Sequence, residues 1–152
     1  MENTALVTGA SQRIGRVICE NIAKKGWNVV IHYNKSKKKA HELKKKIISY
    51  NVNACCIKAD LSKETELKKI FINTKKDMGN INCLINNAST FELDSIENIK
   101  KKNWDYHLNT NVWAPIFLIQ QFIKNLSKKT NGNIINILDQ RVINLTPFFT
   151  TY

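Results

Sequence analysis

Arginine, glycine and proline are all scarce in this chain. Its 152 residues include only three arginines, five glycines and two prolines, and 12 acidic residues leave a formal net charge of +12. A basic excess is typical of nucleic-acid-binding proteins, but here it consists almost entirely of lysine, beside abundant asparagine and isoleucine. This bias is typical of an AT-rich genome. We therefore interpret the lysine runs as solvated helix faces and expect no nucleic-acid partner.

Long hydrophobic runs and metal-ligand motifs are missing as well. No apolar stretch approaches the roughly 18 residues of a membrane span, and the N-terminus shows no basic-then-apolar leader. The four cysteines (Cys19, Cys55, Cys56 and Cys83) lack the spacing of zinc ligands. We expect no membrane association and no metal. The cysteines are interpreted as reduced thiols of a cytoplasmic protein.

Apolar, β-branched runs alternate with amphipathic segments along the whole chain. The expected strands are 5–7, 29–33, 54–58, 83–85 and 134–138, and the expected helices are 17–23, 38–50, 62–78 and 104–126. Repeated strand–helix units predict a parallel sheet with helices on both faces. The predicted fold is a Rossmann-like, doubly wound α/β domain covering residues 1–152, in which ligands bind at the carboxyl ends of the strands.

The segment Thr8–Gly15 lies between the first expected strand and the first expected helix. Backbone N–H groups at a helix N-terminus lack partners and carry partial positive charge, so they bind anions. Gly9 permits a tight turn, and Gly15 permits close approach of a ligand to the backbone. This arrangement predicts a phosphate-binding loop.

The segment from Trp104 to Leu126 is apolar around most of its helical circumference. A helix of this kind is buried or packs against a partner. Pro115 lies inside it, and proline lacks the N–H that continues a helix, so we expect a kink and an unbonded carbonyl. Asn111 lies one turn before Pro115, where it is placed to hold a water molecule or a catalytic group.

Taken in order, these motifs resemble those of the short-chain dehydrogenase/reductase family from Thr4 to Tyr152. The segment 8–15 resembles the family's cofactor loop, and Asp60-Leu61 resembles its adenine-side motif. Asn86-Asn87-Ala88 resembles its fourth-strand motif, and Asn111 falls where the family carries a catalytic asparagine. The resemblance implies an oxidoreductase that is usually a homo-oligomer.

Several details resemble the pteridine-reductase branch of that family. Arg13 replaces the usual middle glycine, and 32–36 is similar to that branch's second-strand ending. The segment 87–91 is similar to its fourth motif, in which the phenylalanine, here Phe91, stacks on the pterin ring. Asp139 precedes Tyr152 by 13 residues, as in that branch. A wider group of bacterial reductases shares many of these features, so pterin and other substrates both stay open.

The ending of the second strand bears on the choice of cofactor. NAD sites place an acidic residue there to bind the ribose 2′-hydroxyl, whereas NADP sites avoid the acid and supply cations. Residues 32–36 contain no acid and include Lys35, and Arg13 is nearby. We therefore predict NADP(H) over NAD(H).

The resemblance implies hydride transfer from NADPH to a C=N or C=O bond of a small molecule. Tyr152 is then the proton donor, Asp139 polarises or positions the substrate and Asn111 holds a water relay. Phe91 and Arg13 are the implied substrate-binding residues. The implied cofactor-binding residues are Gly9, Ser11, Arg13, Ile14, Gly15, His32, Tyr33, Asn34, Ser36, Asp60, Leu61, Asn87, Ala88 and Ser89. Simpler interpretations remain open, with Asp139 as a turn cap and Phe91 as loop packing.

Tyr152 is the last residue of the sequence, whereas the family motif continues to a lysine four positions later. We therefore expect an incomplete NADP-binding domain that stops after the fifth strand and lacks the family's later strands and substrate lid. Three hypotheses follow. The chain is part of an NADPH-dependent reductase, or a non-catalytic remnant that at most binds NADP(H), or, least favoured by the sequence, a basic nucleic-acid-binding module.

Overall fold

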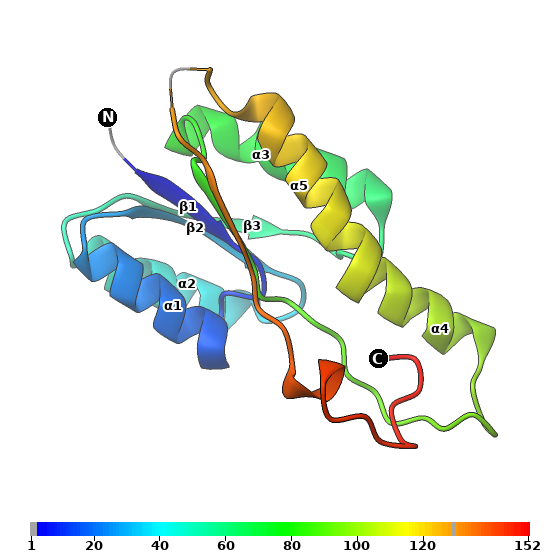
Figure 1. The fold of residues 1–152 in the computed structure, drawn as a ribbon. Coiled ribbons are helices and arrows are strands. Elements are labelled where there is room, and N and C mark those ends of the chain that lie inside the picture. The colour runs from blue at the N-terminus through cyan, green and yellow to red at the C-terminus, as the bar shows by residue number, and fades with distance from the viewer. Residues whose placement is uncertain (1–2, 129) are drawn as a thin grey trace.

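Five parallel strands form one sheet in the computed structural model, which describes residues 3–128 and 130–152 (Figure 1). The strands are β1 (Thr4–Val7), β2 (Asn28–Tyr33), β3 (Ala54–Lys58), β4 (Cys83–Asn86) and β5 (Asn133–Asn136). Their order in the sheet is β3-β2-β1-β4-β5, and every neighbouring pair is parallel. The Rossmann-like α/β architecture expected from the alternating pattern is therefore confirmed.

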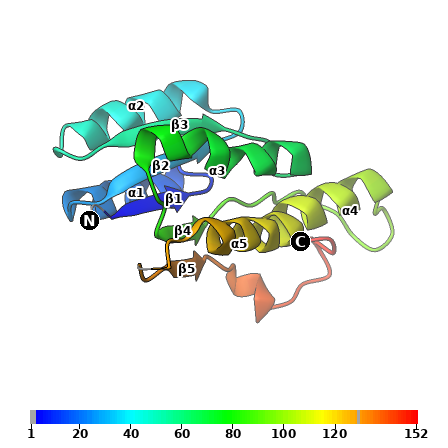
Figure 2. The same cartoon turned by 90° about the horizontal axis from the view of Figure 1, so that it is seen from above.

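Helices cover both faces of the sheet, as Figures 1 and 2 show from two directions. On one face lie α1 (Arg13–Lys24) and α2 (Lys37–Ile48), and on the other lie α3 (Glu64–Met78) and α5 (Ala114–Asn125). Because connections between parallel strands are right-handed, the helices of connections that run toward β3 and those of connections that run toward β5 pack on opposite faces. This switch in direction opens a crevice at the carboxyl ends of β1 and β4.

The hydrophobic core is divided into two clusters by the sheet. Leu6 and Val30 pack toward α3 and α5, whereas Val7 and Ile31 pack toward α1 and α2. Successive side chains of a strand point to opposite faces, so a sheet covered on both sides buries them all. All residues of β1, β2 and β4 are buried accordingly.

Several element boundaries differ from the sequence expectation, and three of them bear on the site or its edge. The first helix begins at Arg13 rather than at 17, so the predicted phosphate loop already includes its first turn. The third helix begins at Glu64 rather than at 62, because the Ser62 hydroxyl donates to Asp60 Oδ1 at 2.7 Å instead of capping the helix. The fifth strand ends at Asn136 rather than at 138.

The long helix expected over 104–126 is built from three consecutive pieces. It begins as α4 (Lys101–Leu108), widens into a π-helical segment over Asn109–Trp113 and continues as α5. The π segment ends just before Pro115, which has no N–H to give to the carbonyl of Asn111. The proline thus coincides with a π-bulge at the place where the sequence indicated a kink.

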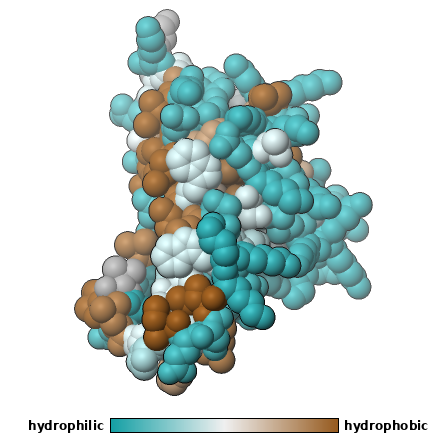
Figure 3. Space-filling view, turned by 90° about the vertical axis from the view of Figure 1, so that its right-hand side faces the viewer, coloured by the Kyte–Doolittle hydropathy of each residue, from teal (hydrophilic) through white to brown (hydrophobic). Residues whose placement is uncertain are grey.

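The long helix buries one side and exposes the other. Phe117, Leu118 and Phe122 pack against the sheet, whereas Ile116 and Ile123 remain more than half exposed. Figure 3 shows hydrophobic side chains running down this side of the molecule, next to a hydrophilic surface. The sequence predicted a helix that is buried or packed against a partner around most of its circumference. In the described chain, only the side that faces the sheet is buried.

Across residues 3–128 and 130–152, no helix is both long and apolar enough to span a bilayer.

Candidate active site

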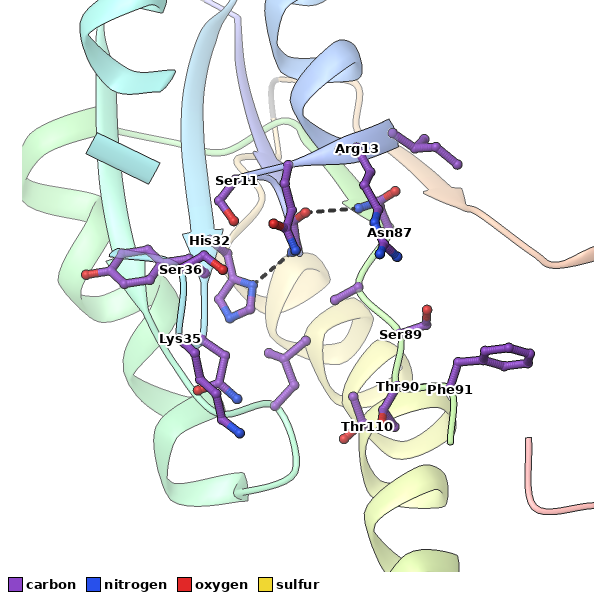
Figure 4. A pocket seen from close by; sticks show the side chains of 18 of the residues that line it. Ser11, Arg13, His32, Lys35, Ser36, Asn87, Ser89, Thr90, Phe91 and Thr110 are labelled. Atoms are coloured by element: carbon purple, nitrogen blue, oxygen red, sulfur yellow. Dashed lines mark hydrogen bonds between the residues drawn. The ribbon is translucent and has the colours of Figure 1, made fainter. Parts of the chain in front are cut away.

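A cleft of about 540 Å³ lies at the carboxyl ends of the strands (Figure 4). Its walls come from the loops after β1, β2, β3 and β4 and from the C-terminal segment. Of the site residues expected from the sequence, those that line it are Gly9, Ser11, Arg13, Ile14, Gly15, His32, Tyr33, Asn34, Ser36, Asp60, Leu61, Asn87, Ala88, Ser89, Phe91, Asp139 and Tyr152. The structure thus brings together residues from five separate segments of the chain.

Five further residues line the cleft without having been expected as site residues: Gln12, Lys35, Thr90, Tyr106 and Thr110. Lys35 belongs to a segment that the sequence did single out, and its positive charge was the available signal. Tyr106 and Thr110 lie on the long helix, and no local sequence pattern distinguishes them from its other residues.

The two glycines of the phosphate loop lie where a side chain does not fit. A Cβ atom on Gly15 would lie 2.5 Å from the carbonyl oxygen of Gly9 and 2.6 Å from Asn87 Nδ2. Gly9 has a φ of +60°, and its Cβ would lie 2.9 Å from Ala88 Cα. Arg13 also has a positive φ, of +51°, which is uncommon for a residue with a side chain. The loop therefore holds its backbone close to the cleft through both close packing and local strain.

Hydrogen bonds between the loops after β1 and β4 fix the floor of the cleft. The Thr8 hydroxyl accepts from the backbone N–H groups of Asn87 and Ala88, each at 2.9 Å. The Asn87 amide donates back to the Thr8 carbonyl at 2.9 Å. These bonds join the loop before α1 to the loop after β4, and no side chain of the described residues caps the N-terminus of α1. An anion can therefore serve as the missing partner.

His32 is a buried tie between three strand ends rather than an exposed side chain. The Gly9 N–H donates to His32 Nδ1 at 3.1 Å, so Nε2 carries the ring proton and donates to the Ala59 carbonyl at 3.0 Å. Burial lowers the pKa of His32 to about 4, against smaller opposing effects of the Ala59 carbonyl and the Asp60 carboxylate. The side chain is thus neutral near pH 7 and holds the phosphate loop against β2 and β3.

This burial predicts a loss of stability in mild acid. The unfolded chain binds a proton on His32 below about pH 6.5, whereas the folded chain does so only near pH 4. The contribution of His32 is therefore complete above pH 6.5 and is lost as the pH falls toward 4, by on the order of 3 kcal/mol. Urea unfolding of wild type and His32→Gln at several pH values between 7.5 and 4.5 measures it. The wild-type curve should fall more steeply, and parallel curves would contradict the assignment.

The end of β2 carries polar and positively charged groups and no acid. Asn34, Lys35 and Ser36 line the cleft there, and Lys39 on α2 donates to Gln12 Oε1 at 2.8 Å. Figure 4 places Lys35 and Ser36 on the opposite side of the cleft from Arg13 and Asn87. The positive charges of Lys35 and Arg13 therefore lie in two different parts of the cleft.

Asp139 and Tyr152 meet at the open end of the cleft. The Tyr152 hydroxyl donates to Asp139 Oδ2 at 3.3 Å, and Asp139 Oδ1 accepts from the Arg141 N–H at 3.0 Å. Asp139 is therefore also a turn cap, as the simpler interpretation held. Burial and the Asp139 carboxylate raise the pKa of Tyr152 above its ordinary value, with smaller opposing effects from Ser89 and Arg141. At neutral pH the Tyr152 hydroxyl therefore keeps its proton.

Phe91 packs against the C-terminal segment while remaining 47% exposed. Its ring stacks on Phe149 at a centroid distance of 4.1 Å and meets Tyr152 edge-to-face at 4.7 Å. The Arg141 guanidinium lies 4.9 Å from the Phe149 ring centroid. The loop-packing interpretation of Phe91 therefore holds for this structure, and the ring still borders the cleft beside Tyr152.

Asn111 is the one expected site residue outside the cleft lining. Its Oδ1 accepts from the Thr90 N–H at 2.8 Å, and its Nδ2 donates to the Thr90 carbonyl at 2.9 Å. Asn111 thus holds the loop after β4 at Thr90, which lines the cleft. A metal-binding cluster of His, Cys, Asp or Glu side chains is absent from the described parts of the chain.

The sequence of this chain is similar to those of known proteins. The family model for short chain dehydrogenase matches residues 3–152. The 3-oxoacyl-[acyl-carrier-protein] reductase FabG of Staphylococcus epidermidis is 32% identical over 137 residues, which cover 90% of this chain and 56% of that protein. The chain therefore spans little more than half the length of this curated relative.

Two solved structures are similar to this chain in fold and sequence. FolM alternative dihydrofolate reductase 1 from Brucella canis, in complex with NADP, matches with a TM-score of 0.94 at 33% identity, covering 99% of this chain and 61% of that one. The angucycline C-6 ketoreductase LanV with bound NADP matches with a TM-score of 0.90 at 28% identity, covering 99% and 60%.

Proposed function

Because this chain belongs to the short chain dehydrogenase family, we propose that it forms the cofactor half and part of the active site of an NADPH-dependent reductase. The reaction class is hydride transfer to a C=N or C=O bond of a small molecule. The observation that carries the proposal is the cleft itself, in which the phosphate loop, an acid-free β2 ending and the Asp139–Tyr152 pair line one continuous space.

The chemistry of the cleft fits a phosphorylated dinucleotide. The uncapped N-terminus of α1 is suited to the pyrophosphate, and Gly9 and Gly15 leave room for it to approach the backbone. Thr110 lines the cleft, and its buried hydroxyl lacks a hydrogen-bond partner among the described residues. Lys35 and Ser36 supply a positive charge and a hydroxyl donor for a 2′-phosphate.

When bound, NADPH supplies the hydride. The residues of this chain hold and orient the partners, and Tyr152 donates a proton to the substrate atom that becomes negative. The hydrogen of its hydroxyl now points to Asp139, so a bound substrate has to replace Asp139 as the acceptor. Asn111 acts through the Thr90 backbone, which it holds in place beside the cleft.

The substrate class that we favour is a planar, pterin-like ring. Phe91 is a half-exposed aromatic residue beside the Tyr152 ring, and aromatic rings stack on one another; since Phe149 stacks on Phe91 in this structure, a pterin-like ring would take the place of Phe149. FolM, one of the similar proteins, is a dihydrofolate reductase by name. A simple 3-oxoacyl ketone, the substrate type in the name of the FabG relative, is the second candidate, since the family motif near Tyr152 suits carbonyl reduction as well.

Cofactor binding and turnover in the intact protein test this proposal. We expect calorimetric titration to give at least about tenfold tighter binding of NADPH than of NADH, because the β2 ending lacks an acid and carries Lys35. NADPH oxidation is then followed with a dihydropteridine and with a 3-oxoacyl thioester. Equal binding of NADH would contradict the cofactor assignment. Binding without oxidation of either substrate would favour the non-catalytic alternative.

The proposal also covers the cellular setting and the binding partners of the protein. We infer a cytoplasmic setting, where the four cysteines stay as free thiols. The intact protein is expected to be a homo-oligomer and to act on a small molecule, without nucleic-acid or membrane partners. Binding to duplex DNA that weakens steeply with added salt would contradict this part of the proposal.

A further inference from the structure

Three polar side chains form a buried cluster behind Tyr152, outside the cleft lining. Asp94 comes from the loop after β4, His107 from α4 and Thr151 from the C-terminal segment. They are 4%, 0% and 5% exposed, respectively. Buried polar groups of this kind are costly unless every one has a partner, so the direction of each hydrogen bond matters.

The hydrogen bonds of the cluster run in one direction. The Glu92 N–H donates to His107 Nε2 at 3.1 Å, which makes Nε2 an acceptor. The ring proton of neutral His107 is therefore on Nδ1, which donates to the Thr151 hydroxyl, and this hydroxyl donates to Asp94 Oδ2. The carboxylate terminates the chain because an ionised carboxyl group only accepts.

Asp94 accepts several hydrogen bonds from the C-terminal segment. Its carboxylate also accepts from the Thr151 N–H at 3.3 Å, and its carbonyl accepts from the Phe149 N–H at 2.8 Å. Burial alone would raise the pKa of Asp94, but hydrogen bonds from the Thr151 hydroxyl and from the Thr151 and Thr150 backbone lower it. The carboxylate is thus charged and stabilised by its donors.

These contacts decide where Tyr152 lies. Residues 143–148 are exposed, and the β-bridge between Ser95 and Phe148 is an isolated one that does not extend into a strand. Thr151 is the residue next to Tyr152, so the backbone that the cluster fixes is the one that carries the phenol. The phenol in turn reaches Asp139 at 3.3 Å and Phe91 at a centroid distance of 4.7 Å.

We propose that Asp94, Thr151 and His107 form a hydrogen-bonded clamp that positions Tyr152 for proton donation. The clamp does not touch the cofactor or the substrate, so its members are positioning residues. The expected effect on catalysis rests on the proposed function. The expected effect on the position of Tyr152 does not depend on it. A displaced proton donor slows the chemical step and leaves cofactor binding unchanged, because the phosphate loop lies elsewhere in the cleft.

A matched pair of substitutions at Thr151 separates the hydroxyl from the volume it occupies. In the intact protein, Thr151→Val is expected to lower kcat by about 10- to 100-fold, with the KM for NADPH unchanged. Thr151→Ser restores the hydroxyl and should stay close to wild type. Thr150→Val, at the exposed neighbour, is the control.

The direct readout is the titration of Tyr152 itself. In protein labelled with ¹³C at tyrosine Cζ, the Tyr152 signal is identified by its loss in Tyr152→Phe. In Thr151→Val its pKa should fall from the raised wild-type value toward the ordinary one, because the ring moves out of its partly buried place beside the Asp139 carboxylate. A purely structural role for Thr151 would lower the melting temperature and leave the Tyr152 titration as in wild type, which would overturn the inference.

Two further provisions separate failure of the inference from misfolding of a variant and from failure of the proposed function. If Thr151→Val does not fold, Asp94→Asn is titrated instead, since it keeps the size of the side chain and removes the charge that accepts three hydrogen bonds. If the wild type neither binds NADPH nor reduces a substrate, the proposed function fails, and the Tyr152 titration still decides the clamp. An unchanged Tyr152 pKa in the variant that is titrated would refute it.

Discussion

Tyr152→Phe is expected to lower kcat for NADPH-dependent reduction by about 10²- to 10⁴-fold, the usual contribution of a general acid. The substitution removes only the hydroxyl that donates to Asp139 and keeps the ring that meets Phe91 at 4.7 Å. Because the phosphate loop and the β2 ending are untouched, the dissociation constant for NADPH should not change. Steady-state kinetics and calorimetric titration on the intact protein measure the two quantities.

Tyr50→Phe is the control for Tyr152→Phe. It also removes one phenolic hydroxyl, at the end of α2 and outside the residues that line the cleft, and it keeps the ring over which the Lys24 ammonium lies at 5.7 Å. Its turnover should equal that of wild type. Full activity in Tyr152→Phe would mean that another group donates the proton. Weakened NADPH binding would instead mean that the phenol is part of the cofactor site.

The second large effect is expected from an acid at the end of β2. Asn34→Asp places a negative charge beside Lys35 and Ser36, in the part of the cleft assigned to the 2′-phosphate. Repulsion between two such charges at close range amounts to about 1–4 kcal/mol, depending on how much water screens them, so the preference for NADPH over NADH should fall by about tenfold or more. NADH itself should bind as well as before or better, since the acid can accept from its ribose hydroxyl.

Asn51→Asp is the matched control for this charge. Asn51 is exposed in the turn after α2, at the end of the sheet away from the cleft, and its positive φ of +60° is one that aspartate tolerates. The variant carries the same extra charge and should keep the wild-type preference. If Asn34→Asp and Asn51→Asp behave alike in a paired NADPH and NADH titration, the 2′-phosphate does not lie at the β2 ending.

Local patterns predicted most of the cleft because its residues follow strands directly. Gly9, Asn34, Asp60 and Asn87 each come just after a strand, and parallel strands bring their carboxyl ends to one edge of the sheet. Short apolar runs bounded by turns indicated this edge, and the family resemblance implied that these residues bind the cofactor. Lys35 was visible in the same way, as a charge in a segment already marked as part of the site.

The residues that the sequence did not reveal are those whose partners are distant. Asp94 and Thr151 are 57 positions apart and His107 lies between them, so no periodicity relates the three. The stacking of Phe91 on Phe149 joins two loops, and either ring alone is simply an aromatic residue in an irregular segment. The bond between Asn111 and Thr90 likewise depends on how the long helix lies over the loop after β4.

The sequence by itself determined the alternation of strands and helices, the glycine loop and the absence of an acid at the β2 ending. These are local properties, set by side-chain polarity, backbone freedom and charge within a few residues. Only the tertiary structure decided which side of the long helix is buried, that His32 is a neutral tie rather than an exposed ligand group, and where Tyr152 lies. Those features depend on contacts between segments far apart in the chain, which form only once the sheet and its helices have closed around the core.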